Sequence, residues 1–250
     1  MRVWNSINKD HLQQWKKKST HVHYDAMRRR AKVKGIPWDD ETFPKEVAKE
    51  MMTKPCEYCG LASDGTFVNG NDRMNNNHHY TLSSCVTCCK SCNFIKKCLD
   101  PTTFIDRCLH ISALHGGSLG RLNRDAWPSE MRTNMVSTQS YMIRAEDKAL
   151  PFEIQVESFS LLREEPCHHC HHVEEMNGVD RKDNTCGYTA ANCVVCCKEC
   201  NHMKAQMSDT DFIASCIRVA EFEGRTRDYS SIPQTMKAIT RRSLPSKAHG

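Results

Sequence analysis

Four cysteines in the second half of the chain have the spacing of a tetrahedral metal site. Cys167 and Cys170 form one Cys-x-x-Cys pair, and Cys197 and Cys200 form another. Thiolates paired in this way bind Zn²⁺ in a closed shell of four ligands, which leaves no open position for a substrate. We therefore expect a structural zinc ion, and any chemistry must come from the polar residues that this ion holds in place.

The same string of residues occurs earlier in the chain. The segments 69–96 and 177–204 align without a gap, which is hard to obtain by chance. The corresponding cysteines of the earlier string are Cys56, Cys59, Cys89 and Cys92. The sequence therefore predicts a duplicated domain with two structural zinc ions, one for each set of four thiolates.

Polar residues that could do chemistry lie between and beside the cysteine pairs. Asp180 is expected at the end of a strand and Asn201 at the start of a helix, and both offer oxygen ligands. If they face each other, they could hold Mg²⁺, which keeps several waters and binds phosphate oxygens. Asp72 and Asn93 occupy the equivalent positions in the earlier string.

These motifs resemble the HNH, or ββα-metal, nucleases, and among them the zinc-knuckle type that includes phage recombination endonuclease VII. The resemblance rests on a Cys-x-x-Cys pair, a strand ending in Asp, and a second Cys-x-x-Cys pair followed by Asn. The run 178–193 is also similar to HNH-like proteins of phages and large viruses. Together these matches cover the central part of each half, while the helical arms fall outside them.

The resemblance implies a metal-binding Asp and Asn in each copy, phosphate contacts from the following lysine, and a loop asparagine that braces the site. The candidate catalytic residues of the second copy are therefore Asp180, Arg181, Asn192, Asn201 and Lys204. The first copy has Ser84 where the second has Asn192. If either copy cuts nucleic acid, we expect it to be the second.

One departure from the family concerns its general-base histidine, which is replaced by Arg73 in one copy and Arg181 in the other. A guanidinium stays protonated at neutral pH and cannot take a proton from water. Two interpretations of the Asp-Arg pair remain open, namely phosphate binding and an internal ion pair that pins the strand to the loop. We expect the nearby histidines to be exposed or to support the site, and a complete thiolate set makes zinc ligation by His169 or His171 unnecessary; these histidines are His78, His79, His168, His169, His171, His172 and His202.

The elements that position these residues are predicted to be short, apart from an N-terminal helix. Periodic apolar residues predict helices over 10–34 and 42–54, the second capped by Thr42, and strands near 66–73 and 80–87. A helix is expected over 93–97, and another begins at Asp100 and Pro101 and ends at Gly116. The second copy repeats this order. The remaining cysteines are expected to be small buried apolar residues, and they are Cys85, Cys88, Cys98, Cys108, Cys186, Cys193, Cys196 and Cys216.

The predicted fold is α+β, with two tandem zinc-stapled ββα-metal, treble-clef-like modules, each flanked by helices. Its parts are a basic helical arm (1–36), a first module (37–118), a linker (119–140), a second module (141–224) and an extended, polar basic tail (225–250). Each half is too small for a generous apolar core, so a metal ion is expected to supply part of its folding free energy.

Basic residues are concentrated at the N-terminus. Residues 1–34 contain ten basic and two acidic residues, although the net charge of the whole chain is only +5. Such an arm suits a phosphate backbone, because each neutralised phosphate releases counterions. The candidate nucleic-acid contacts are Lys16, Lys17, Lys18, Arg28, Arg29, Arg30, Arg73 and Lys96. A solvated helix with a few core aromatics is the alternative interpretation of the arm.

Cysteine usage and hydropathy indicate the surroundings in which the chain works. The cysteine doublets suit metal ligation better than disulfides, and no apolar signal segment follows Met1, so we expect an intracellular reducing compartment. No apolar run is long enough to cross a bilayer, so no membrane partner is expected.

The sequence thus predicts a nucleic-acid-binding protein built on a duplicated, catalytically weakened or inactive HNH-type scaffold. Its expected partners are RNA or DNA and other proteins of a larger nucleoprotein assembly, such as a ribonucleoprotein. One alternative is an Mg²⁺-dependent endonuclease that hydrolyses phosphodiester bonds in the second module. A third possibility is a zinc-organised protein-interaction module.

Overall fold

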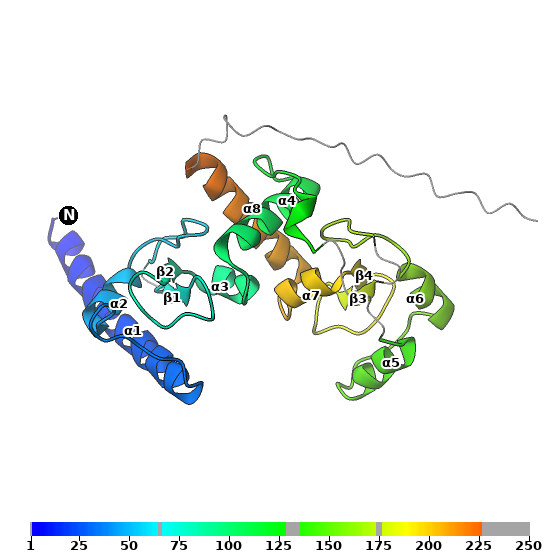
Figure 1. The fold of residues 1–250 in the computed structure, drawn as a ribbon, viewed down its shortest axis with the longest axis horizontal. Coiled ribbons are helices and arrows are strands. Elements are labelled where there is room, and N and C mark those ends of the chain that lie inside the picture. Colours follow the sequence, from blue (N-terminus) through cyan, green and yellow to red (C-terminus); the bar gives the residue numbers. More distant parts are fainter. Residues whose placement is uncertain (1, 65–66, 129–135, 174–176, 227–250) are drawn as a thin grey trace, which may run out of the picture.

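The structure is a computed structural model and describes residues 2–64, 67–128, 136–173 and 177–226, with side chains from residue 18 onward. It is a mixed α+β fold with two small sheets, one in each half of the chain (Figure 1). The first half contains α1 (Arg2–Val33), α2 (Lys45–Met51), β1 (Gly70–Arg73), β2 (Cys85–Cys88), α3 (Lys90–Lys96) and α4 (Pro101–Leu114). After a 3-10 turn, η1 (Arg124–Ala126), come α5 (Thr138–Glu146), α6 (Val156–Leu162), β3 (Gly178–Arg181), β4 (Cys193–Cys196), α7 (Lys198–Lys204) and α8 (Asp209–Thr226).

The two sheets are antiparallel pairs with the same register. Asp72 faces Val86 across the first sheet, and Asp180 faces Val194 across the second. A single bridge also joins Trp38 to Tyr80 in the first half, and Phe152 joins Tyr188 in the same way. Two-stranded sheets are marginal on their own, so each needs the metal site and the surrounding helices for stability.

Three apolar clusters hold the fold together. An outer cluster around Phe43 packs α1 and α2 against β2, and a second outer cluster around Phe159 packs α5 and α6 in the same manner. The central cluster contains residues of both halves, including Phe104 of α4 and Phe212 of α8. The boundaries expected at residues 118 and 141 therefore separate segments that share one core.

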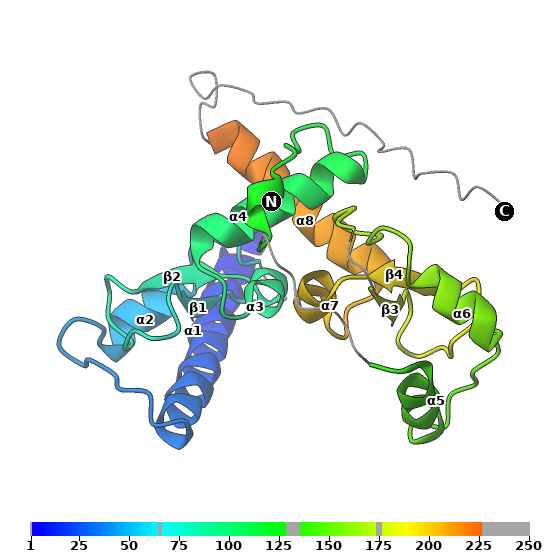
Figure 2. The same ribbon diagram turned by 45° about the vertical axis from the view of Figure 1, so that its right-hand side comes forward.

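The helices α4 and α8 pack on each other between the two sheets, and α3 and α7 lie side by side beneath them (Figure 2). Cys108 of α4 contacts Cys216, its equivalent in α8. His110 of α4 lies with Nε2 3.0 Å from the carbonyl oxygen of Cys170, in the second copy. Its equivalent in α8, Arg218, lies beside the Cys59 thiol of the first copy. Each closing helix thus contacts the metal-binding turn of the other copy.

Most of the predicted helices are present, and the starts of α2 and α3 differ from the prediction. Thr42 does not cap α2, because Asp39 accepts hydrogen bonds from the Thr42 amide and hydroxyl, and Pro44 precedes the helix. The helix expected over 93–97 begins earlier, at Lys90, because Cys89 is its N-cap. The cap at Asp100 is confirmed, since its carboxylate accepts a hydrogen bond from the Thr103 amide at 3.0 Å.

Part of the predicted linker belongs to the central core. Trp127 is buried, and its ring lies 4.6 Å from that of His110. The Arg107 Nε–H donates to the carbonyl oxygen of Ala126 at 2.8 Å. A tryptophan among polar residues can bury its apolar surface only by docking, so this segment is held in place rather than free.

At the ends of the chain, α1 begins before the predicted residue 10, and α8 runs to Thr226, past the predicted start of the tail. The tail from residue 227 onward and the side chains of Lys16 and Lys17 lie outside the described part of the structure. None of the helices described is both long and apolar enough to cross a membrane.

Candidate metal centres

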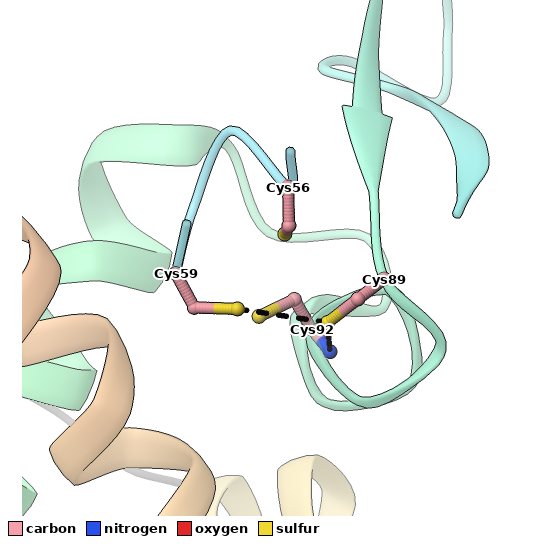
Figure 3. A group of neighbouring side chains, drawn as sticks. All are labelled: Cys56, Cys59, Cys89 and Cys92. Atoms are coloured by element: carbon pink, nitrogen blue, oxygen red, sulfur yellow. Dashed lines mark hydrogen bonds between the residues drawn. The ribbon is translucent and has the colours of Figure 1, made fainter. Parts of the chain in front are cut away.

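The two predicted thiol sets converge, and we call them the first and second quartets. All four sulfur atoms of each quartet lie within 4.8 Å of one another, and all eight cysteines are buried. Cys59 and Cys89 have their sulfurs 3.7 Å apart in the first quartet (Figure 3), as do Cys170 and Cys197 in the second. A tetrahedron with Zn–S bonds of about 2.3 Å has edges of about 3.8 Å. A disulfide would need about 2.05 Å. The geometry therefore fits a shared zinc ion in each quartet.

Each quartet combines a turn and a helix N-terminus. The turns, residues 56–59 and 167–170, are called the knuckles below. After the first knuckle, Gly60 adopts φ +67° and its amide donates to the Cys56 carbonyl at 2.8 Å; His171 takes this place in the second, at φ 52°. The last two cysteines of each quartet lie at the start of α3 and α7, where the Cys92 and Cys200 amides point at sulfur at 3.4 Å. Amide hydrogen bonds of this kind favour thiolates.

Contacts among the buried thiols of each quartet shift their pKa values in opposite directions. Hydrogen bonds from the other thiols keep the pKa of Cys56 and the pKa of Cys167 well below the usual thiol value. Burial and contact with Cys167 raise the pKa of Cys200 well above it. A metal ion that binds all four sulfurs must therefore displace protons, so zinc binding and folding are coupled to proton release.

The aspartate expected to bind Mg²⁺ is paired with the lysine expected to bind phosphate. Lys204 Nζ lies 2.8 Å from Asp180 Oδ2, though not aligned as a hydrogen bond, and it donates to the Arg181 carbonyl at 2.9 Å. The Lys204 side chain is completely buried. A buried ammonium is tolerable only with such partners. The geometry therefore gives no support to Mg²⁺ at Asp180, and the ammonium faces the interior instead of a phosphate.

The first copy has the same arrangement with one more partner. Lys96 is completely buried, and its Nζ lies 3.0 Å from Asp72 Oδ2 and 3.2 Å from the Arg73 carbonyl oxygen. In addition, the Tyr58 hydroxyl donates to the Asp72 carboxylate at 2.9 Å. The nucleic-acid contact expected of Lys96 is thus replaced by an internal ion pair, because the side chain lies inside the core.

Of the candidate oxygen ligands, only the aspartates take part in these buried pairs. Asn93 is exposed on α3 and Asn201 is half-buried on α7. Within the described residues, the structure joins Asp180 to Lys204 and records no hydrogen bond between Asp180 and Asn201. The sequence contained a sign of these pairs, because an aspartate and a lysine recur in both copies with the same number of residues between them.

The arginine that follows each buried aspartate braces the loop after the first strand of each sheet. Arg181 Nη1 donates to the carbonyl oxygens of Asn184 at 3.1 Å and Cys186 at 2.8 Å. Its guanidinium lies 5.1 Å from the centre of the Tyr188 ring. Arg73 makes the equivalent bonds, to the carbonyl oxygens of Asn76 and His78, and packs on Tyr80. The strand is thus pinned to the loop through carbonyls, and not through an ion pair between Asp and Arg.

The loop asparagine contributes to the same brace. Asn192 Nδ2 donates to the Gly187 carbonyl at 2.8 Å, and its Oδ1 accepts from the Asp183 amide at 2.9 Å. Ser84 makes the corresponding bond in the first copy, from its hydroxyl to the His79 carbonyl at 2.6 Å. Both residues therefore shape the loop, with no described contact to the buried aspartate.

One histidine differs from expectation. His78, His79, His171 and His202 are exposed, but His169 is completely buried, at the position that Tyr58 occupies in the first copy. Burial lowers the pKa of His169 to about 4, so the ring is neutral at neutral pH. Its ligand nitrogen lies within 4.8 Å of those of His115 and His168, and also close to Asp180 and Cys196. Sequence spacing does not reveal this cluster, since His115 is distant in the chain.

The other cysteines follow the prediction with two exceptions. Cys98 and Cys186 are exposed, so the expectation of burial is wrong for them. The remaining six extra cysteines are buried; they are Cys85, Cys88, Cys108, Cys193, Cys196 and Cys216.

The basic arm divides into a packed and an exposed part. Arg28 is committed to the fold, because its Nη2 donates to Asp40 at 3.1 Å and its guanidinium lies 4.8 Å from the centre of the Trp38 ring. Lys18, Arg29 and Arg30 are exposed. Of the described candidate nucleic-acid contacts, these three are therefore the ones open to solvent.

Comparison with known proteins shows sequence similarity to a viral protein and shows no family. No protein-family model and no solved structure matches the chain. The chain is 32% identical over 183 residues, or 72% of its length, to an uncharacterized protein of Acanthamoeba polyphaga mimivirus. The chain spans only 34% of the length of that viral protein, so the similarity concerns one part of it.

Proposed function

We propose that the chain binds nucleic acid through two tandem, treble-clef-like ββα modules of the HNH type that no longer hydrolyse phosphodiester bonds. The observation that carries this proposal is the buried Asp–Lys pair, which recurs as Asp72–Lys96 and Asp180–Lys204 beside two complete quartets. In a nuclease of this type the carboxylate would have to face a metal ion and substrate. The lysine ammonium neutralises the charge of the buried carboxylate and occupies the position that a metal ion would need.

The exposed side of α1 supports nucleic acid as the partner. Tyr24, Met27 and Ala31 are buried on one face of this helix, while several basic residues are exposed elsewhere on it. Exposed basic residues of the described part and the turn after it are Lys18, Arg29, Arg30, Lys32 and Lys34. The last four of these lie within one short stretch, 29–34, so they can contact neighbouring phosphates together.

The position of α1 also suits this role. Figure 1 shows α1 and α2 side by side at the end of the molecule farthest from α5 and α6. The buried face of α1 and the Arg28–Asp40 ion pair fix the helix to the first copy. A helix held rigidly at an end of the molecule presents its charges without further ordering, which lowers the entropic cost of binding.

Equilibrium binding to labelled single-stranded RNA, structured RNA and duplex DNA over a range of salt concentrations tests the proposal. Replacing Arg29 and Arg30 together by Glu should weaken binding about tenfold or more and reduce its salt dependence. The matched control replaces Lys148 and Lys198, two exposed lysines of the second copy, by Glu. Binding that responds neither to salt nor to the α1 substitutions would contradict the proposal.

A cleavage assay separates the alternative functions. Plasmid and structured RNA incubated with the protein and Mg²⁺ should remain intact, because Asp180 is occupied by Lys204. Mg²⁺-dependent cleavage that is abolished by Asp180→Asn would instead establish an endonuclease in the second copy. A zinc-loaded protein that neither binds nor cuts any of the nucleic acids would favour a protein-interaction module.

A further inference from the structure

Four polar side chains from three separate segments converge at the junction of the two copies. His115 follows the last residue of α4, His168 and His169 lie within the second knuckle, and Asp209 is the first residue of α8. The ligand nitrogens of the three histidines lie within 4.8 Å of one another. Asp209 lies beside two of them, with Oδ2 3.2 Å from His168 Nε2 and Oδ1 3.5 Å from His169 Nε2. This cluster contains none of the quartet sulfurs.

Several atoms of the cluster are buried without a hydrogen-bond partner in the part of the chain that the structure describes. They are His115 Nε2, both ring nitrogens of His169, and Asp209 Oδ1. His169 is completely buried, and a neutral imidazole carries one N–H and one lone pair. Buried polar groups left without partners are unfavourable, and several such groups in one place indicate an absent ligand that bonds to all of them.

We propose that His115, His168, His169 and Asp209 bind a third divalent transition-metal ion, which we identify with zinc for the purpose of testing. Three imidazoles and one carboxylate are ligands that zinc accepts in a tetrahedral shell. Bonds of about 2.0–2.1 Å give tetrahedral edges of about 3.3–3.4 Å. His168 Nε2 lies 3.2 Å from Asp209 Oδ2 and His169 Nε2 lies 3.5 Å from Oδ1, so each imidazole lies about one such edge from a different oxygen of the carboxylate.

The neighbourhood of the cluster favours an exchangeable metal site. The His168 side chain is 33% exposed and that of Asp209 is 14% exposed, so an ion can enter from solvent, while His169 closes the inner side. Phe212 packs against the buried His169 ring, with 5.0 Å between the ring centres, and holds it in place. The site is therefore open on one side and supported on the other.

The first copy has no counterpart of this site. Glu57 and Tyr58 replace the two knuckle histidines, and Pro101 stands where the second copy has Asp209. The Tyr58 hydroxyl is satisfied by Asp72, so its position requires no additional ligand. A third ion would thus join α4 of the first copy to the knuckle and α8 of the second, acting as a clamp between the copies.

Metal content of the full-length protein tests the site. After purification with zinc and dialysis to remove loosely bound ions, we expect three zinc ions per chain. Zinc X-ray absorption should show a first shell of sulfur with nitrogen and oxygen in a ratio of eight to four, from the ligands named above. His115→Ala and His168→Ala should each lower the content to two ions and remove the nitrogen signal.

The controls separate this site from the quartets. His202→Ala changes an exposed histidine of α7 and should keep three ions. Cobalt substitution of His115→Ala should preserve the thiolate-to-metal absorption of both quartets, which shows that the variant is folded. Wild-type protein with two zinc ions and an all-sulfur shell would overturn the proposal without reference to any variant. The result is independent of whether the chain binds nucleic acid.

Discussion

The two copies share a metal scaffold and differ in the residue that sits on their buried aspartate. In the first copy the Asp72 carboxylate accepts a hydrogen bond from Tyr58, whereas in the second copy His169 lies close to Asp180 and also to His115 and His168. The quartets and Asp–Lys pairs are the same in both. The thiols and the internal ion pair are therefore the structural elements that both copies share. The third residue of the knuckle, Tyr58 or His169, differs between the copies and can take a different role in each.

The helices that flank the two copies also differ. The first copy carries α1, with 32 residues and an exposed basic side, whereas the corresponding helix of the second copy, α5, has nine residues. The second copy instead has the histidine cluster at its knuckle. The duplicated scaffold thus presents charge at one end and metal ligands at the centre.

The largest expected effect comes from removing a quartet thiol. Cys200→Ser and the matched Cys92→Ser should each lose one zinc ion and unfold the protein, since structural zinc contributes about 10–16 kcal/mol of apparent binding free energy. Because the central cluster contains residues of both copies, we expect one cooperative loss of structure in each variant. Circular dichroism with zinc analysis measures this, and a variant that retains half of the helical signal would show that the copies fold separately.

A smaller effect is expected from breaking the ion pairs. Lys204→Met leaves Asp180 buried without its partner and should lower the free energy of unfolding by about 3–5 kcal/mol. Lys96→Met should cost less, because Tyr58 still donates to Asp72.

Denaturant unfolding of the zinc-loaded variants measures both losses. Combining Lys204→Met with Asp180→Leu should recover most of the stability, since an apolar pair needs no charge partner. Equal losses in the two copies would contradict the role assigned to Tyr58.

The smallest effect concerns the residue that follows each knuckle. Gly60→Ala should destabilise by about 1–3 kcal/mol, because φ is +67° and a Cβ would lie 2.5 Å from the Phe222 ring. The reverse change in the second copy, His171→Gly, should stabilise by about 1 kcal/mol, because a histidine there holds φ 52°. Thermal unfolding compares the pair, and stabilisation by both substitutions would show that Phe222 moves aside.

The spacing of residues along the chain predicted much of the fold. It did not predict most contacts between distant segments. The positions of the eight quartet cysteines, the strand and helix order and the Asp100 cap could be predicted because each depends on neighbours in the chain. Lys204 is buried against Asp180 and the Arg181 carbonyl, which lie more than twenty residues earlier in the chain, so a lysine considered by itself suggested a surface contact. Trp127, alone in a polar segment, was the available sign that the expected linker docks.

The histidine cluster shows the limit most directly. His115, the knuckle and Asp209 come from three segments that meet only when α4 packs on α8. Their residue types were visible in the sequence, but nothing in their separation along the chain brought them together.

The exchange of contacts between α4 and α8 also governs how the chain can fold during its synthesis. The first knuckle leaves the ribosome early, yet Phe222 and Arg218, which cover it, are made near the end of the described chain. Contacts between such distant residues slow folding, because a long loop must close before they form. Until α8 is made, the part of the first knuckle that Phe222 and Arg218 contact remains uncovered, and transiently exposed apolar surface of this kind favours aggregation.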